Sequence, residues 1–193
     1  MEKKALSKMS IKELHKLFPI YLTEHKSCWK DWYEEEKEAL KCILSYNDLK
    51  IYHIGSTALN NIWAKPIIDI LIEIPKTVPM LRMKEILISS GYICMSESKD
   101  KNRMSFNKGY TENGFADRVF HLHLRFFGDN DELYFRDYMN DDLKLAKEYE
   151  KLKLSLWKKY EFDRDAYTYA KGEFVKKYTE CAKKNIKADT NID

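Results

Sequence analysis

One segment of the sequence constrains the fold more than any other. Residues 67–74 read IIDILIEI, with branched apolar side chains at both odd and even positions. Such a run is typical of a strand covered on both faces, which places it inside a sheet rather than at an edge. Asp69 interrupts this run. A carboxylate in such a strand costs several kcal/mol unless it is paired or binds a cation. Asp69 is therefore either a buried salt-bridge partner or a functional group.

Composition excludes several classes of protein. The 193 residues are 44% apolar and 13% aromatic, which favours a folded core over disorder. Lys and Arg number 34 against 31 Asp and Glu, and a net charge of +3 argues against dedicated nucleic-acid binding. No apolar stretch reaches the roughly 20 residues of a membrane span, and residues 1–18 lack an apolar signal core. The four cysteines form no C-x-x-C pair, so we expect reduced thiols and a cytoplasmic protein.

Periodicity predicts an α+β protein with a mixed sheet flanked by helices and a helical C-terminal part. A capping box, Ser10 with Glu13, begins the first helix. The predicted helices cover residues 11–18, 28–44, 79–90, 133–139, 142–160 and 163–183. The predicted strands cover residues 20–23, 50–53, 67–74, 92–95, 103–108 and 119–127. We expect residues 1–129 to form an α/β part, 130–184 to pack on it as one unit, and 185–193 to be a disordered tail.

The motif His53-Ile-Gly55-Ser56-Thr57 follows a predicted strand. Glycine lets a backbone approach a ligand closely, and exposed N–H groups beside Ser and Thr hydroxyls suit an anion such as phosphate. An ordinary strand–turn–helix junction would have the same sequence, so both interpretations stay open.

Two histidines lie on one predicted strand as His121-x-His123. On a strand their side chains point to the same side, with Cα atoms about 6.6 Å apart. This spacing is compatible with a shared metal ion or anion. Two half-exposed histidines on a polar face would give the same pattern.

Several motifs in order resemble the GrpB family over residues 17–182. They are HIGST at 53–57, KPIIDI at 65–70, HLH at 121–123, FRDY at 135–138, Tyr149-x-x-Leu152-Lys153 and Asp165-x-Tyr167-x-x-x-Lys171. The resemblance implies the polymerase-β-like nucleotidyltransferase fold, in a family whose activity is poorly defined. Related domains are fused to dephospho-CoA kinase in some bacteria.

In that fold, the resemblance implies that a Gly-Ser turn holds the terminal phosphates of a nucleotide and that carboxylates bind two Mg²⁺ ions. Asp69 matches the first carboxylate, but Leu71 stands where the second belongs. Glu73 lies about 13 Å from Asp69 along the strand and cannot replace it. We therefore expect a single-metal site of Asp69, His121 and His123, with His53 as a further candidate ligand. The metal would be Mg or Mn, with Zn or another transition metal as the alternative that imidazole favours.

The resemblance also places basic side chains near this site. Lys65, Arg136, Lys153 and Lys171 would complete an anion pocket with Gly55, Ser56 and Thr57. The alternative for Arg136 is a structural ion pair with Asp137 or Asp165.

Three functions remain open from the sequence. The first is a nucleotidyltransferase-like protein that binds a nucleotide or small phosphorylated metabolite, with Asp69, His121 and His123 catalytic. The second is a non-catalytic binding or accessory module, related to coenzyme A by analogy with the fusions. The third is a metal-dependent phosphoesterase built on the same Asp and His residues. The substrate and the oligomeric state cannot be read from the sequence.

Overall fold

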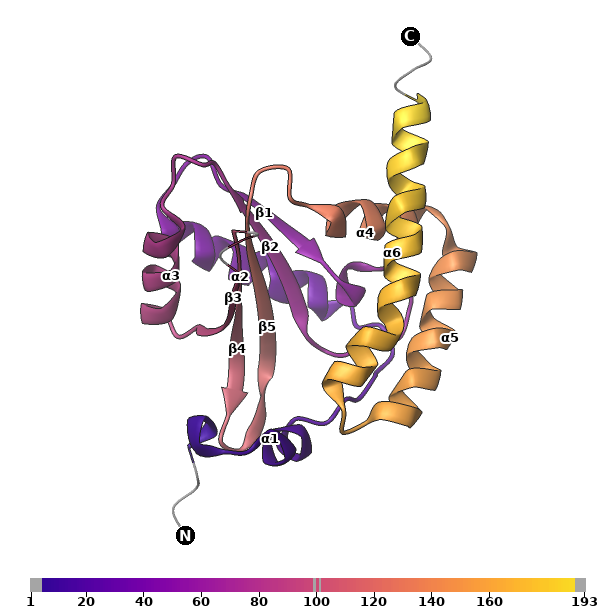
Figure 1. The fold of residues 1–193 in the computed structure, drawn as a ribbon, viewed down its shortest axis with the longest axis horizontal. Coiled ribbons are helices and arrows are strands. Elements are labelled where there is room, and N and C mark those ends of the chain that lie inside the picture. The colour runs from indigo at the N-terminus through magenta and orange to yellow at the C-terminus, as the bar shows by residue number, and fades with distance from the viewer. Residues whose placement is uncertain (1–4, 99, 101, 190–193) are drawn as a thin grey trace.

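The computed structural model describes residues 5–98, 100 and 102–189. Its core is a five-stranded mixed sheet with helices on both sides (Figure 1). In chain order the elements are η1 (Leu6–Lys8), α1 (Ile11–Leu17), α2 (Cys28–Leu44), β1 (Lys50–Ile54), η2 (Ser56–Ala58), β2 (Ile68–Ile74), α3 (Met80–Ser89), β3 (Ile93–Ser98), β4 (Arg103–Thr111), β5 (Gly114–Phe126), α4 (Asp131–Asp141), α5 (Leu143–Tyr160) and α6 (Arg164–Asp189).

The strands lie in the order β1-β2-β5-β4-β3. The β2–β5 pair is parallel, and the other neighbouring pairs are antiparallel. The strand that contains Asp69 is therefore interior, as its apolar sequence predicts. One row of directly paired residues crosses the whole sheet: Ile54, Asp69, His121, Asn107 and Ile93. Paired residues project from the same face, so this row fixes which side chains can meet above the sheet.

The opposite face of the sheet carries the main core. Alternate residues such as Ile70 and Leu122 are fully buried there, under Trp29 and Leu40 of α2 and Met83 of α3. The alternation of β5, with Leu122 and Leu124 on the core side, leaves its histidines on the other face. The prediction that His121 and His123 point to the same side of their strand is confirmed.

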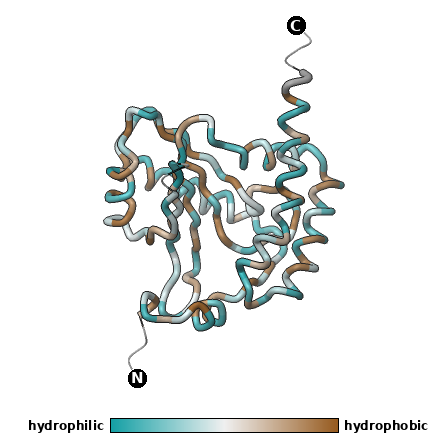
Figure 2. The backbone as a smooth tube through the Cα atoms, viewed as in Figure 1, coloured by the Kyte–Doolittle hydropathy of each residue, from teal (hydrophilic) through white to brown (hydrophobic). Residues whose placement is uncertain are grey.

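The C-terminal helices form a second core beside β1. Phe135 of α4 and Tyr149 of α5 pack with Leu59 and Ile62, which follow the Gly-Ser turn. Figure 1 shows α4, α5 and α6 gathered on the β1 side of the sheet, while α1 lies near the ends of β4 and β5. Figure 2 shows hydrophilic and hydrophobic segments alternating along α5, as expected of a helix that packs through one face.

The largest differences from the predicted elements are in three places. Residues 20–23 form only an isolated bridge, Thr23 to Ala64. Strand β5 begins at Gly114, earlier than predicted, because a tight turn there pairs Thr111 with Gly114. Helix α6 continues to Asp189, which corrects the expectation of disorder for 185–189; residues 190–193 lie outside the described part. The Ser10–Glu13 capping box is confirmed. No helix in the described ranges combines the length and apolar character needed to cross a membrane.

Candidate functional site

A large open cleft lies over the polar row of the sheet. Its volume is about 1450 Å³, and residues of α1, β4, β5, α5 and α6 line it. Most of the side chains predicted from the sequence to form the site also line it: Gly55, Ser56, Lys65, Asp69, His121, His123, Lys153 and Lys171. Segments more than 100 residues apart in the sequence thus meet in one cavity.

The Gly-Ser turn packs directly against Asp69. Gly55 has φ +71°, a backbone conformation that L side chains rarely adopt. A Cβ atom at Gly55 would also lie 2.2 Å from Oδ2 of Asp69. Only glycine therefore lets the turn and the strand approach this closely, and the next residue, Ser56, lines the cleft with Asp69.

Asp69 faces both imidazoles of β5. Its Oδ1 lies 3.3 Å from Nδ1 of His121 and 3.9 Å from Nε2 of His123. Burial alone would raise the pKa of Asp69, but the two adjacent imidazoles outweigh it and hold the pKa well below its usual range. Burial lowers the pKa of His121. The cluster is therefore a carboxylate beside a neutral imidazole, His121.

A chain of hydrogen bonds sets the tautomer of His121. Arg164 of α6 donates to the hydroxyl of Tyr110 at 2.7 Å, and that hydroxyl lies 2.8 Å from Nε2 of His121. Because Arg164 can only donate, the Tyr110 proton is available for Nε2. The ring proton of His121 then lies on Nδ1, which faces Asp69.

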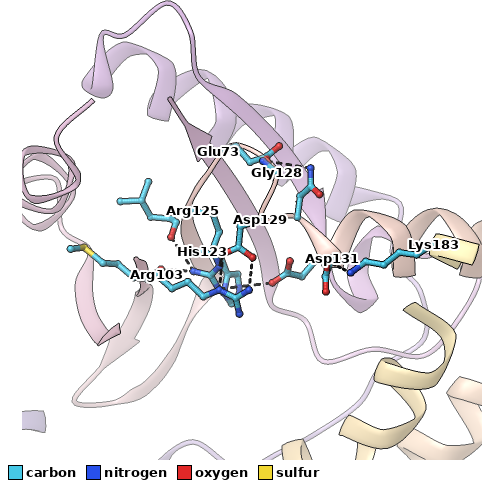
Figure 3. A network of polar contacts seen from close by, with 12 residues as sticks. Glu73, Arg103, His123, Arg125, Gly128, Asp129, Asp131 and Lys183 are labelled. Atoms are coloured by element: carbon cyan, nitrogen blue, oxygen red, sulfur yellow. Dashed lines mark hydrogen bonds and ion pairs between the residues drawn. The ribbon is translucent and has the colours of Figure 1, made fainter. Parts of the chain in front are cut away.

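Arg125 acts on His123 in the same way. Its guanidinium lies 3.4 Å from Nδ1 of His123 and also donates to the carbonyl of Met104. Arginine never accepts a hydrogen bond, so this contact favours a ring proton on Nε2 of His123, toward Asp69. Figure 3 shows Arg125 next to His123 in a network that includes Arg103 paired with Asp129.

Four cationic side chains form the opposite wall of the cleft: Lys65, Lys153, Arg164 and Lys171. In the described part of the chain, no carboxylate forms an ion pair with any of the four. Burial, followed by repulsion from Lys171, lowers the pKa of Lys65 and of Lys153 to about 7 each. Lys153 is 1% exposed and donates to the carbonyl of Trp63 at 2.5 Å. The gathered cations repel one another, and this repulsion adds to the effect of burial on the two lysine pKa values.

Three residues predicted for the site lie outside the cleft. His53 is stacked on Tyr33, with ring centroids 4.7 Å apart, and its Nε2 lies 3.0 Å from the Thr57 hydroxyl. Thr57 is buried and donates to the carbonyl of Ile67. Arg136 contacts Asp137 and donates to the carbonyl of His53, which is the structural alternative noted above. These residues support the turn from behind rather than facing a ligand.

Neither Leu71 nor Glu73 supplies a second carboxylate to the cleft. Leu71 is fully buried. Glu73 is 2% exposed and accepts hydrogen bonds from the Gly128 backbone and the Asn130 side chain (Figure 3). It therefore anchors the loop between β5 and α4. Within residues 5–98, 100 and 102–189, no three His, Cys, Asp or Glu side chains are arranged as a metal site.

A metal that needs three protein ligands does not fit this arrangement, because the ring protons of His121 and His123 point at Asp69. Mg²⁺ and Mn²⁺ have a different requirement. They are commonly held by one or two carboxylates together with phosphate oxygens of a ligand. The ionised Asp69, which lines the same cleft as the four cationic side chains, fits that second mode, and a bound metal stays a prediction.

The sequence did not indicate Tyr110, Arg164, Arg125 or Asn107 as site residues. Strand register brings Tyr110, Arg125 and Asn107 to the site, and the docking of α6 brings Arg164. No spacing within one segment marks Tyr110, Asn107 or Arg164. Charge spacing along β5 could have identified Arg125, since it continues the alternation of the two histidines.

Comparison with known proteins finds a matching family model and several bacterial relatives. The family model described as GrpB protein matches residues 19–181. The glutamate-rich protein GrpB of Alkalihalophilus pseudofirmus is 35% identical, over 81% of this chain and 91% of its own length. The UPF0157 protein YqkA of Bacillus subtilis is 31% identical over 96% of this chain, which spans about half the length of YqkA.

Solved structures share the fold. The conserved protein GrpB from Enterococcus faecalis superposes with a TM-score of 0.73 and 32% identity, over 86% of this chain and 99% of that one. The GLD-2/RNP-8 complex matches with a TM-score of 0.50 at 13% identity, over 83% and 61% of the two chains, a likeness of fold alone. The expected mixed sheet flanked by helices, with a helical C-terminal part, is confirmed. With a matching family model over most of its length, the chain belongs to the GrpB family.

Proposed function

We propose that this protein binds a nucleotide or a small phosphorylated metabolite in the cleft above β2 and β5. The observation that carries the proposal is the meeting of three features in one cavity: the Gly55-Ser56 turn, the ionised Asp69 and a wall of unpaired cations. A polyanion would relieve the mutual repulsion of Lys65, Lys153 and Lys171.

Each part of the site has a chemical task in this proposal. The backbone and hydroxyl of the Gly-Ser turn, with Lys65 and Lys171, bind phosphate oxygens. Asp69 binds a divalent cation that the phosphates carry, and such a cation would supply charge neutralisation at the phosphates. His121 and His123 hold Asp69 in place through their ring protons. Transfer of a nucleotidyl group to a small acceptor is the reaction that this fold would support.

The test is calorimetric and thermal-shift binding of ATP, CTP, GTP, UTP and coenzyme A, each with and without Mg²⁺ or Mn²⁺. We expect stabilisation by at least one of them, strengthened by the metal. Lys171→Gln should weaken binding about tenfold or more, whereas Lys176→Gln, on an exposed position of the same helix, should not. Asp69→Asn should remove the metal effect, with Asp117→Asn on exposed β5 surface as its control.

Failure of every nucleotide and of coenzyme A to bind would overturn the proposal. Binding without turnover of any nucleotide would instead favour the second function, a non-catalytic binding module. The buried Leu71 in place of a second carboxylate favours that module.

The third candidate is a metal-dependent phosphoesterase built on Asp69 and the two histidines beside it, and it requires that the histidine nitrogens facing Asp69 lose their ring protons when the metal binds. It predicts bound Zn or Fe in the purified protein, lost in His121→Ala and His123→Ala. Release of phosphate from a panel of phosphate esters would then distinguish it from nucleotidyl transfer.

A further inference from the structure

The side chain of Asn107 has no task in the fold or in the site as described so far. It lies on β4, in the row that contains Asp69 and His121, and it lines the cleft. The residue is only 8% exposed. Within the described part of the chain, its side-chain amide makes no hydrogen bond.

This amide is available to a ligand. Asn carries one acceptor and two donors, and the amide atoms of Asn107 are not fully buried but reach the cleft. Its paired neighbours on the sheet offer nothing to it: His121 is engaged by Tyr110 and Asp69, and Ile93 is apolar. The amide therefore faces the one place from which a partner can come, the cleft.

The surroundings of Asn107 differ from those of Asp69. Ile93 and Met95 of β3, which are 43% and 56% exposed, also line the cleft and give an apolar surface beside the amide. Adjacent strands are about 4.8 Å apart, so Asn107, two strands from Asp69, lies about 10 Å from it across the sheet. This separation is comparable to that between the phosphates of a nucleotide and the edge of its base.

We propose that Asn107 recognises the hydrogen-bonding edge of a nucleobase, whose ring face lies on Ile93 and Met95 while its phosphates lie at Asp69 and the cationic wall. A base presents a donor and an acceptor side by side, and the Asn amide pairs with such an edge through two hydrogen bonds. The assignment rests on the proposed function and narrows its ligand to nucleotides.

The test compares the dissociation constants of ATP, CTP, GTP and UTP with that of inorganic tripolyphosphate, by calorimetry in Mg²⁺. At least one nucleotide should bind about tenfold or more tightly than tripolyphosphate, because a bidentate base contact is worth about 1–3 kcal/mol. Asn107→Leu should abolish that advantage and leave tripolyphosphate binding within about twofold of wild type.

A second variant changes the preference instead of removing it. Asn107→Asp presents acceptors only, and guanine is the base with two adjacent donors on its pairing edge. With tripolyphosphate as the reference, Asn107→Asp should weaken the binding of ATP, CTP and UTP. The nucleotide preference of the protein should then move toward GTP. Asn47→Asp, at an exposed position in the turn before β1, is the control for added negative charge.

The outcomes separate the two proposals. If tripolyphosphate binds as tightly as every nucleotide, Asn107 does not recognise a base and the proposed function stands. If Asn107→Leu weakens tripolyphosphate as much as nucleotides, Asn107 is a structural residue and the assignment is wrong. If tripolyphosphate, every nucleotide and coenzyme A all fail to bind, both proposals are overturned. Melting temperatures of all variants establish that they are folded.

Discussion

The backbone of Gly55 and the carboxylate of Asp69 are in direct contact, so that even one added carbon on Gly55 would overlap Asp69. Gly55→Ala should therefore destabilise the protein by about 2 kcal/mol or more, through the clash and the positive φ together. It should also abolish ligand binding, because relief of the clash moves either the turn or Asp69. Urea denaturation and calorimetry measure the two effects.

Gly172 provides the matched control. It lies within α6, it has no atom within 4 Å of the position that its Cβ would occupy, and its φ is not positive. Gly172→Ala should raise stability by about 0.5–1 kcal/mol through helix propensity. Equal effects of the two substitutions would contradict the assigned role of Gly55.

His53 makes the stability of the protein depend on pH. Burial lowers the pKa of His53 to about 4, below the usual 6.5. The unfolded chain therefore takes up a proton between pH 6.5 and 4 that the folded chain does not, and stability falls as pH falls through this range. His53→Gln keeps a donor for Thr57 and removes the proton uptake. As pH falls through that window, the free energy of unfolding should decrease less steeply in the variant than in wild type, by up to about 1.4 kcal/mol per pH unit. Parallel stability–pH curves for wild type and variant would contradict this role.

Lys153 carries an amine in a position that an apolar side chain would occupy more favourably. Its pKa falls to about 7 because burial disfavours the charged form. The unfolded chain stays protonated up to about pH 10.5, so the burial of Lys153 costs stability at neutral pH. Lys153→Met should be at least as stable as wild type at pH 7, and binding of tripolyphosphate should fall. A variant that binds normally would remove Lys153 from the site.

Glu73 and Asp69 lie on the same face of β2 but have separate roles. Glu73 anchors the loop after β5 through Gly128 and Asn130. Glu73→Ala should cost about 1–3 kcal/mol, since two donors lose a buried acceptor. Nucleotide affinity should stay within about twofold of wild type. A selective loss of binding, with stability unchanged, would instead place Glu73 in the site.

The two imidazoles should be in opposite tautomers. Tyr110 and Arg164 favour the proton of His121 on Nδ1, and Arg125 favours that of His123 on Nε2. Long-range ¹H–¹⁵N correlation spectra distinguish the two forms directly at neutral pH. Zn²⁺ added to the sample should leave the His123 form unchanged. A His123 ring protonated on Nδ1 would show that Arg125 does not control it.

Local sequence signals predicted most of the elements. Helix 28–44 was predicted from apolar residues at helical spacing, and the structure begins and ends it at the same residues. The interior position of β2 followed from an apolar run that only a doubly covered strand tolerates. Residues 20–23 do not form a strand, because Thr23 makes an isolated bridge to Ala64 while the backbone of Ile20 donates to the carbonyl of Glu161 in the C-terminal helical part.

The site was only partly predictable for a physical reason. Gly55, Asp69, His121 and His123 lie in short motifs whose chemistry is visible in the sequence. A cationic side chain can face the cleft or pair with a carboxylate elsewhere, and which of the two occurs depends on how the helices dock. The sequence therefore does not show that Lys171 lines the cleft whereas Arg136 does not. The contact of Arg136 with Asp137 lies between adjacent residues, yet the backbone carbonyl of His53 that holds it is 83 residues away.

The parallel pairing of β2 with β5 has a consequence for how the site comes into existence. Asp69 and His121 are 52 residues apart, and α3, β3 and β4 lie between their strands in the sequence. Such a long-range contact forms late, after local helices and hairpins. A nascent chain released before β5 has the turn and the carboxylate but not the histidines that orient it. A ligand that contacts both strands would therefore bind only the completely folded protein, in which β5 is paired with β2. By mass action, such binding would stabilise the protein against unfolding.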